Sequence, residues 1–430
     1  MATAPLVTGR DRWARVSASA GFVVQGLSFA AVIAQVSAIQ QKFGFTDGEL
    51  TMMLASVPIL AGVGSVLAGI LAPRLGSRWV LGTATIIEAL CVAGVGLASQ
   101  RPLYFVVLAL LAIMVGAVDA AMNMQGTAVQ RRYGRSILAS CHGWWSVGAV
   151  VATSSAFWAG SQHISMTTHL GAVGALGFVL AALAVPGLLP KAVEAQEPAA
   201  EAAQHHATHG VKRRGLIVTL VGIALMVMFV GDSAATSYGT PFMNHVLGFD
   251  PNGAKVQTGL LAYLVFQLLG RVVADRIIGA AGAARTLVGG SLVAAAGFAV
   301  IVFGQEWATT VVGFGLMGAG LSVVVPLTFS AADGLDPAGT GTVIARVNLF
   351  NYLGVLLGAG SIGAIAGADY TNLRAAFAVP GVLVLLSMAL APAFRVVDRA
   401  RAAAREASAA LPEHQPVPAP ATALQQSTVD

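Results

Sequence analysis

The most constraining feature of the chain is a series of twelve long apolar segments joined by short polar connections. A helix needs roughly 20 apolar residues to cross a bilayer, and each segment is about that long. With 56% hydrophobic residues, 10% charged residues and a mean hydropathy of +0.77, the chain is far more apolar than a soluble domain. We therefore predict an all-α membrane protein with twelve transmembrane helices. Their expected limits are 17–39, 51–72, 80–99, 102–127, 138–160, 168–190, 215–239, 257–279, 284–304, 307–330, 341–366 and 373–394.

Positive charge alternates from one connection to the next. Of the 24 Lys and Arg residues, only Lys42, Arg101, Lys255 and Arg374 fall on the side opposite the N-terminus. Cationic residues concentrate in the cytoplasmic connections of membrane proteins. This rule predicts a multi-pass protein of the bacterial cytoplasmic (inner) membrane with both termini in the cytoplasm. The sequence pI of about 9.5 then reflects the charge of these connections, and no nucleic-acid partner is expected.

The segments divide into two sets of six, separated by a polar linker. The expected organisation is a cytoplasmic N-terminus (1–16), an N-terminal six-helix bundle (17–190), a cytoplasmic linker (191–214), a C-terminal six-helix bundle (215–394) and a mostly disordered cytoplasmic tail (395–430). His205, His206 and His209 in the linker lack regular ligand spacing, so a solvated linker is favoured over a metal site. Cys91 and Cys141 lie within apolar segments and are expected to be core residues.

Features of the first set of segments recur in the second set in the same order. His142 is followed six residues later by Gly148, and Asn348 is followed by Gly354 at the same spacing. A parallel repeat of this kind indicates two halves related by an axis along the membrane normal. We therefore predict two pseudo-symmetric six-helix bundles with a cavity between them.

A short motif after the second segment connects the chain with a known family. Residues 69–79, GILAPRLGSRW, follow the pattern G-x-x-x-D-R-x-G-x-R-R, with Pro73 in place of the acid. On this motif and its two six-helix halves, the chain resembles the major facilitator superfamily of secondary transporters. The resemblance implies that family's fold and a latch between the halves on the cytoplasmic side. Candidate latch residues are Arg74, Arg78, Asp275, Arg276 and Arg346.

Three further stretches resemble a bacterial subgroup near the fucose-permease-like sugar symporters. They are DAAMN at 119–123, RRYGR at 131–135 and HGWWS at 142–146. Fucose permeases carry an acid in the first span, where this chain has Gln25. Arg271 and Arg346 lie near expected cytoplasmic helix ends, where snorkelling or latch pairing would accommodate them.

Ionisable groups at membrane depth point to the mechanism, because each costs at least ~2.5–3.5 kcal/mol at a helix centre. Asp119 has Asn123 one helical turn away. Low-dielectric surroundings favour the uncharged carboxyl, which is the property that a proton carrier needs. His142 lies at similar depth, and it would form a proton relay with Asp119 if their helices pack together. A purely structural role is the alternative for both residues.

Further polar residues are expected to line a solute site or to carry protons. Asp232 in the seventh segment is the second half's acidic candidate for proton coupling. The expected solute-binding residues are Gln25, Asn123, Trp145, Ser146, Thr236, Gln267, Asn348 and Asn351. Such amides and hydroxyls suit a hydroxyl-rich or zwitterionic solute, and packing hydrogen bonds are the alternative. For Glu88 in the third segment, a pairing with the second segment or an error in the segment limits is expected rather than a role in transport.

These observations predict a secondary active transporter of a small polar solute that works by alternating access and proton-coupled symport. Proton-coupled efflux of a drug or metabolite and a non-transporting membrane sensor are the alternatives. No enzymatic activity, cofactor or metal is expected, because there is no phosphate-binding loop and residues 313–318 match G-x-G-x-x-G only inside an apolar segment. The expected partners are a small-molecule solute, protons and the lipid bilayer, with the protein a monomer.

Overall fold

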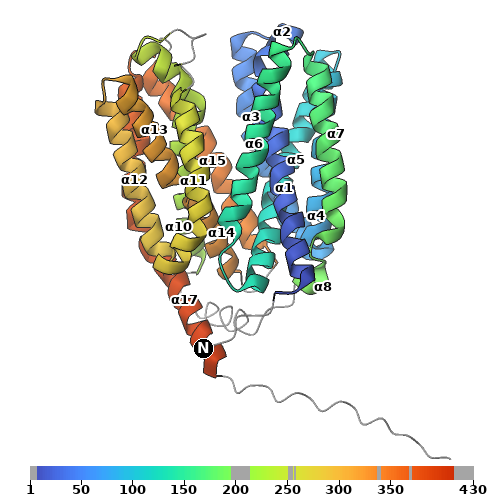
Figure 1. Cartoon of the computed structure of the whole chain (residues 1–430), viewed down its shortest axis with the longest axis vertical. Coiled ribbons are helices and arrows are strands. Elements are labelled where there is room, and N and C mark those ends of the chain that lie inside the picture. Colours follow the sequence, from blue (N-terminus) through green and yellow to red (C-terminus); the bar gives the residue numbers. More distant parts are fainter. Residues whose placement is uncertain are drawn as a thin grey trace, which may run out of the picture.

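The computed structural model describes residues 7–194, 214–249, 255, 258–336, 340–367 and 370–410. Within these ranges the chain is helical almost throughout and contains no β-strand. Figure 1 shows two groups of long helices standing side by side, one from each half of the sequence. The all-α prediction is confirmed. The linker histidines His205, His206 and His209 lie outside the described residues.

Each half of the sequence forms its own bundle. The first bundle contains α1 (Gly9–Ala34), α2 (Val36–Phe43), α3 (Asp47–Leu75), α4 (Ser77–Leu97), α5 (Arg101–Tyr133), α6 (Leu138–Ser161), α7 (Met166–Ala184), η1 (Val185–Gly187) and α8 (Lys191–Glu194). The second bundle contains α10 (Arg214–Pro241), η2 (Phe242–Val246), α11 (Thr258–Ala281), α12 (Ala283–Phe303), α13 (Trp307–Leu321), α14 (Val324–Gly334), α15 (Thr342–Ala366), α16 (Leu373–Leu386), η4 (Ser387–Leu390) and α17 (Ala391–Ala410).

Helix limits differ from the predicted spans where local signals override hydropathy. The first helix begins at Gly9 instead of residue 17, because Thr8 and Asp11 form a capping box at its start. The predicted span 307–330 is broken into α13 and α14. Pro326 lies in the first turn of α14 and has no N–H for the carbonyl one turn earlier, which accounts for the break. After the last predicted span, α17 continues to Ala410, well past the expected limit of 394.

Ten helices or helix pairs in the described part of the chain are each long and apolar enough to cross a bilayer. The remaining two long helices are α6 and α11. Each has 24 residues, a length of about 36 Å at 1.5 Å per residue. Both pack within their bundles, α6 against α1 and α11 against α13. Together these segments account for the twelve predicted spans.

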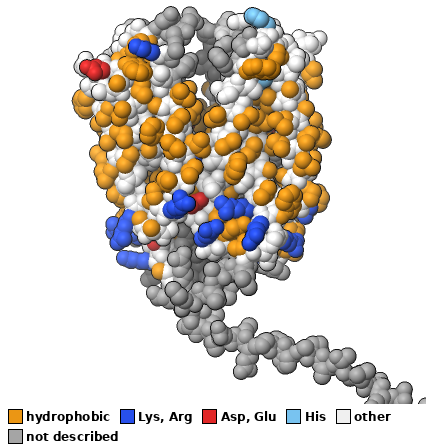
Figure 2. Space-filling model, viewed as in Figure 1, with side chains coloured by type: hydrophobic (Ala, Val, Ile, Leu, Met, Phe, Trp, Pro, Cys, Tyr) orange, Lys and Arg blue, Asp and Glu red, His pale blue; other side chains and the backbone are white. Residues whose placement is uncertain are grey.

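The surface of the molecule divides by charge. Figure 2 shows hydrophobic side chains over the middle of the visible face and Lys and Arg side chains gathered toward the lower end. Here α1 begins, α3 ends and α12 begins, with exposed arginines that include Arg12, Arg74, Arg276 and Arg285. We name this end the basic end, and the other the opposite end. Exposed apolar side chains such as Val106 cover the helices between the two ends, as expected for a surface in contact with lipid.

The internal repeat has a structural counterpart in two close helix pairs. Gly148 brings α6 so near α1 that a Cβ atom there would lie 2.2 Å from the carbonyl oxygen of Val23. Gly354 does the same between α15 and α10, where a Cβ atom would lie 2.4 Å from the carbonyl oxygen of Met226. Small residues allow helices to approach closely in membranes, where packing drives their association. The matched glycines of the two halves therefore hold equivalent helix pairs together.

We predict that Gly148→Ala destabilises the protein by roughly 1–3 kcal/mol, because the new methyl group meets backbone atoms of α1. Gly143→Ala on the same helix is the matched control, since its Cβ would meet nothing within 4 Å. The control should unfold at the wild-type temperature or slightly above it. Thermal unfolding of the detergent-purified variants measures both effects, and equal unfolding temperatures would contradict the prediction.

Candidate functional site

The carboxyl group of Asp119 lies between the two bundles and is bonded to both. Asp119 is on α5 and its side chain is 9% exposed. Gln25 of α1 donates from Nε2 to Oδ1 at 2.8 Å, and Tyr352 of α15 donates from its hydroxyl to Oδ2 at 2.6 Å. One carboxylate oxygen is thus held by the first bundle and the other by the second. A buried carboxylate needs donors of this kind, because leaving it unpaired costs several kcal/mol.

Neighbouring polar groups of the first bundle extend this arrangement. The indole N–H of Trp145 donates to Gln25 Oε1. Asn123 donates from Nδ2 to the backbone carbonyl of Asp119 at 2.8 Å, and its Oδ1 lies 3.1 Å from Nε2 of His142. The predicted pair of Asp119 and His142 is therefore separated by the amide of Asn123. Because an amide side chain does not titrate, Asp119 and His142 do not form a direct proton relay in this state.

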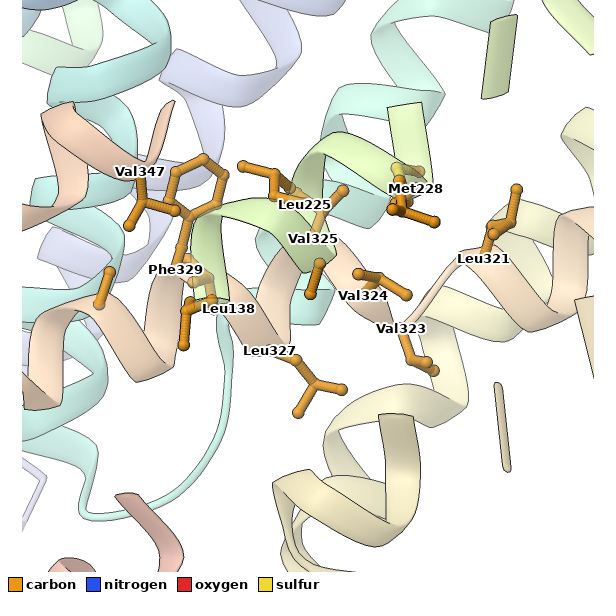
Figure 3. Packing of buried hydrophobic residues seen from close by; sticks show 14 of the residues in the cluster. Leu138, Leu225, Met228, Leu321, Val323, Val324, Val325, Leu327, Phe329 and Val347 are labelled. Atoms are coloured by element: carbon orange, nitrogen blue, oxygen red, sulfur yellow. The ribbon is translucent and has the colours of Figure 1, made fainter. Parts of the chain in front are cut away.

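Aromatic rings enclose the imidazole of His142. The ring of Phe22 meets it edge-on with centroids 4.8 Å apart, and Phe329 of α14 stacks with it at 6.1 Å and 9°. Figure 3 shows Phe329 among buried apolar side chains, with Val347 beside it. The histidine is therefore held by side chains from both bundles.

Asp232 on α10 anchors a second polar cluster within the second bundle. The hydroxyl of Tyr263 donates to Asp232 Oδ1. Gln267 Nε2 donates to the Tyr263 hydroxyl at 2.7 Å and lies 3.4 Å from the same carboxylate oxygen. Thr236 donates to the backbone carbonyl of Asp232, and its side chain is exposed. The partners of Asp232 come from α11, so this cluster ties α10 to α11.

Arg271 connects the two clusters across the space between the bundles. Its Nη1 donates to Ser146 Oγ at 2.6 Å and lies 3.4 Å from the carbonyl oxygen of His142. The guanidinium carbon lies 5.9 Å from the centre of the Trp145 ring, which permits a cation–π contact. Arg271 is 5% exposed and bonds to the first bundle, so of the two expected alternatives snorkelling is excluded and pairing between the bundles remains.

The two predicted amides of α15 have different surroundings. Asn348 is buried, and its Nδ2 donates to Ser65 Oγ on α3 at 3.2 Å and to the Tyr352 hydroxyl at 3.3 Å. Its Oδ1 is buried without a protein partner among the described residues. Asn351 is partly exposed. Asn348 therefore supports the hydroxyl group that holds Asp119.

Sequence reasoning missed Tyr352 and Tyr263, the two hydroxyl donors to the carboxylates. Each tyrosine lies four residues from a predicted amide, Tyr352 after Asn348 and Tyr263 before Gln267. Residues four apart share a helix face. A tyrosine at this spacing from an amide in an apolar helix was the available signal.

Glu88 on α4 is fully buried, and neither carboxylate oxygen has a hydrogen-bond partner among the described residues. The predicted pairing with the second span is not observed. An ionised carboxylate in this position would be uncompensated, so the group is expected to carry its proton.

At the basic end, charged and polar groups join the bundles directly. Arg131 of α5 pairs with Asp333 of α14 at 2.5 Å, with side chains 6% and 10% exposed. Asp275 of α11 accepts bonds from Ser136 Oγ and from the backbone N–H groups of residues 139 and 140, at 2.7, 3.1 and 2.9 Å. The carboxylate therefore caps the start of α6, where exposed N–H groups favour a negative charge.

The other predicted latch residues do not bridge the bundles in this structure. Arg74, Arg276 and Arg346 are exposed. The guanidinium carbon of Arg78 lies 5.8 Å from the centre of the adjacent Trp79 ring. The recorded contacts between the bundles at this end come instead from Asp275, from the Arg131–Asp333 pair and from Gln130, which donates to Ser330 at 3.0 Å.

We predict that Asp333→Ala lowers the free energy of unfolding by roughly 3–5 kcal/mol, because it removes one partner of a buried ion pair. The double variant Arg131→Met/Asp333→Leu should recover most of this loss, since neither charge of the pair then remains. Glu49→Ala is the control: it breaks the exposed Arg101–Glu49 pair and half of the Thr46 capping box, and should destabilise the protein much less than Asp333→Ala does. Thermal unfolding checks all three, and a wild-type unfolding temperature for Asp333→Ala would refute the prediction.

Comparisons with known proteins agree with this architecture. Residues 18–262 and 257–426 match the model of the Major Facilitator Superfamily. An uncharacterized MFS-type transporter of Yersinia pestis is 28% identical over 392 residues, covering 90% of this chain and 96% of that protein. The membrane protein MosC of Rhizobium meliloti is 26% identical over 351 residues, covering 81% of this chain and 82% of that protein.

Solved structures share the fold at low sequence identity. The human organic anion transporter MFSD10 superposes with a TM-score of 0.70 at 14% identity, covering 89% of this chain and all of that one (100%). The Escherichia coli fucose:proton symporter superposes with a TM-score of 0.69 at 16% identity, covering 88% of this chain and 97% of that one. The two six-helix bundles and the family match over most of the sequence establish that the chain belongs to the major facilitator superfamily of membrane transporters.

Proposed function

We propose that the protein is a proton-coupled symporter that carries a small polar solute across the bacterial cytoplasmic membrane by alternating access. The observation that carries this proposal is the position of Asp119, whose two carboxylate oxygens accept hydrogen bonds from different bundles. A carboxyl group shared in this way responds to a proton and to the relative position of the bundles at once. Membership of a family of secondary transporters supplies the transport function itself.

Protonation of Asp119 would change the bonds that hold the bundles. The ionised carboxylate accepts two charge-assisted bonds, which are about twice as strong as neutral ones. A proton on Oδ2 replaces an acceptor site with a donor and weakens the bond from Tyr352. The bundles then separate more easily at this level. Proton binding would in this way favour the rearrangement that exposes the site to the other side of the membrane.

The arrangement of contacts supports an outward-facing state. The recorded bonds between the bundles in the described part of the chain lie between Asp119 and the basic end, and Figure 1 shows the helices diverging toward the opposite end. By the positive-inside rule, the basic end, where α1 begins, is cytoplasmic. Asp275 and the Arg131–Asp333 pair would then form the closed cytoplasmic gate, which must open for release into the cell.

The neutral polar side chains of the two clusters and of α15 indicate the class of solute. Gln25, Gln267, Asn348 and Asn351 offer neutral donors and acceptors, and the indole of Trp145 offers an apolar wall. Such groups suit a hydroxyl-rich or zwitterionic molecule, for which an aromatic surface and amides supply stacking and hydrogen bonds. The fold is shared with a fucose:proton symporter, but the acid of fucose permeases in the first span is Gln25 here. We therefore infer that Asp119 takes over the role of the titrating group.

The proposal can be tested on the detergent-purified protein. A thermal-shift screen against sugars, amino acids and small acids first identifies a solute, because a ligand of the native state raises its unfolding temperature. Uptake of that solute into proteoliposomes under an inward proton gradient then measures transport. Accumulation that does not depend on the proton gradient would contradict proton coupling.

We predict that Asp119→Asn abolishes accumulation driven by the proton gradient but retains solute exchange in the absence of a gradient. Asparagine keeps an acceptor for Gln25 or Tyr352 and cannot carry the proton, so binding and rearrangement persist while coupling is lost. Asp232→Asn, which removes the second bundle's carboxylate, tests whether one or both acids couple. Unchanged accumulation by Asp119→Asn would remove Asp119 from the mechanism.

A further inference from the structure

At the basic end of the second bundle, a cavity of about 540 Å³ lies between the beginning of α12 and the beginning of α17. One part of its wall is apolar and consists of Ala281, Ala284 and Val288. The rest is charged, formed by Arg285 of α12 together with Arg395, Asp398 and Arg399 of α17. Three cations and one acid therefore surround a space with an apolar side.

The single acid of this cavity is already engaged. Asp398 Oδ1 accepts the backbone N–H of Ala283 at 3.0 Å, and Oδ2 accepts that of Ala284 at 3.1 Å. Asp398 thus caps the start of α12. Within the described ranges, no carboxylate forms an ion pair with Arg285, Arg395 or Arg399. The cavity therefore keeps an excess of positive charge.

The positions of the three arginines are unfavourable in the absence of an anion. Arg395 and Arg399 are four residues apart on α17, so they share a helix face and repel each other. Arg285 lies in the first turn of α12, where the helix dipole disfavours a cation. An anion bound among the three guanidinium groups would turn each of these unfavourable placements into an attractive one, because guanidinium binds phosphate oxygens in a bidentate manner.

The depth of the cavity identifies the kind of anion. Arg285 is the third residue of the membrane-spanning helix Ala283–Phe303, and Arg395 directly follows the apolar run of the last span, which ends at Phe394. These are the span ends, at the level of lipid headgroups. Ala284 and Val288 are four residues apart and extend the apolar wall along α12. A ligand with a negative head and an apolar chain fits such a wall.

We propose that this cavity, which we name the α12–α17 site, binds the phosphodiester headgroup of an anionic phospholipid, with Arg285, Arg395 and Arg399 contacting the phosphate. The bound lipid ties α17 to the start of α12 at the membrane surface. This assignment is independent of the transported solute and of proton coupling. A bound anionic headgroup explains why Arg285, Arg395 and Arg399, which take no part in the transport site, lie around one cavity.

Native mass spectrometry of the detergent-purified full chain tests the site with defined lipids. Phosphatidylglycerol and phosphatidylcholine of the same acyl chains are titrated separately, because both contain a phosphodiester but only the first has a net negative charge. We expect phosphatidylglycerol to bind more tightly to the wild type. The variant Arg285→Gln/Arg395→Gln/Arg399→Gln should bind it about tenfold more weakly or worse, since each basic residue contributes to attraction of anionic lipid.

The matched control is Arg10→Gln/Arg12→Gln/Arg135→Gln, which removes the same charge from exposed arginines at the basic end of the first bundle. It should keep phosphatidylglycerol affinity close to that of the wild type. An equal loss in the control, or no preference for phosphatidylglycerol in the wild type, would overturn the proposal. The unfolding temperature of each triple variant in neutral detergent separates lost binding from lost folding. The α12–α17 variant should unfold at or above the wild-type temperature, because charge repulsion is relieved.

A final arm distinguishes the lipid from a soluble anion. Inorganic phosphate at millimolar concentration should raise the unfolding temperature much less than phosphatidylglycerol does, because it has no chain to place along Ala284 and Val288. An equal rise with inorganic phosphate that is lost in the α12–α17 variant would show a soluble-anion site and would reject the lipid assignment.

Discussion

The shared carboxyl group of Asp119 is the interaction on which the centre of this transporter depends. An ionised carboxylate at membrane depth needs compensating donors, and the donors to Asp119 come from both bundles. The cost of leaving either oxygen unpaired thus resists separation of the bundles at mid-membrane. Asn348 donates both to the Tyr352 hydroxyl and to Ser65 of α3. The bond between Tyr352 and Asp119 therefore depends on α3 as well as on α15. The cost of removing the Asp119 carboxylate from water therefore constrains how the two bundles are arranged.

The basic end adds a second set of contacts that depends on different chemistry. Asp275 caps α6 and Arg131 pairs with Asp333, so each contact joins one bundle to the other through full or partial charges. The equivalent acid in the first half is absent, since Pro73 occupies that position. These contacts are therefore asymmetric: Asp275 of the second bundle caps a helix of the first bundle, and Pro73, at the matching position of the first bundle, has no carboxylate to do the same.

Most of the fold could be predicted from the sequence, because only a few kinds of structure can span a bilayer. Apolar segments of spanning length must form helices, and paired glycines such as Gly148 and Gly354 mark equivalent close contacts in the two halves. The limits of the helices were harder to predict from the sequence. The capping box at Thr8 and the break caused by Pro326 are local signals that a hydropathy pattern averages away. The hydropathy pattern indicates which residues are removed from water. It does not indicate the residue at which the backbone hydrogen bonds of a helix end.

The sequence by itself determined that helices cross a membrane in two related sets, and it placed Asp119, His142 and Asp232 at depth, because apolar runs and rare ionisable residues are visible in one dimension. Only the tertiary structure decided which partners those residues have. Asn123 stands between Asp119 and His142, Arg271 is buried between the bundles, and Tyr352 reaches Asp119 from a helix far along the chain. Hydrogen bonds require atoms to meet within about 3 Å, and residues distant in sequence are brought to that distance only by packing.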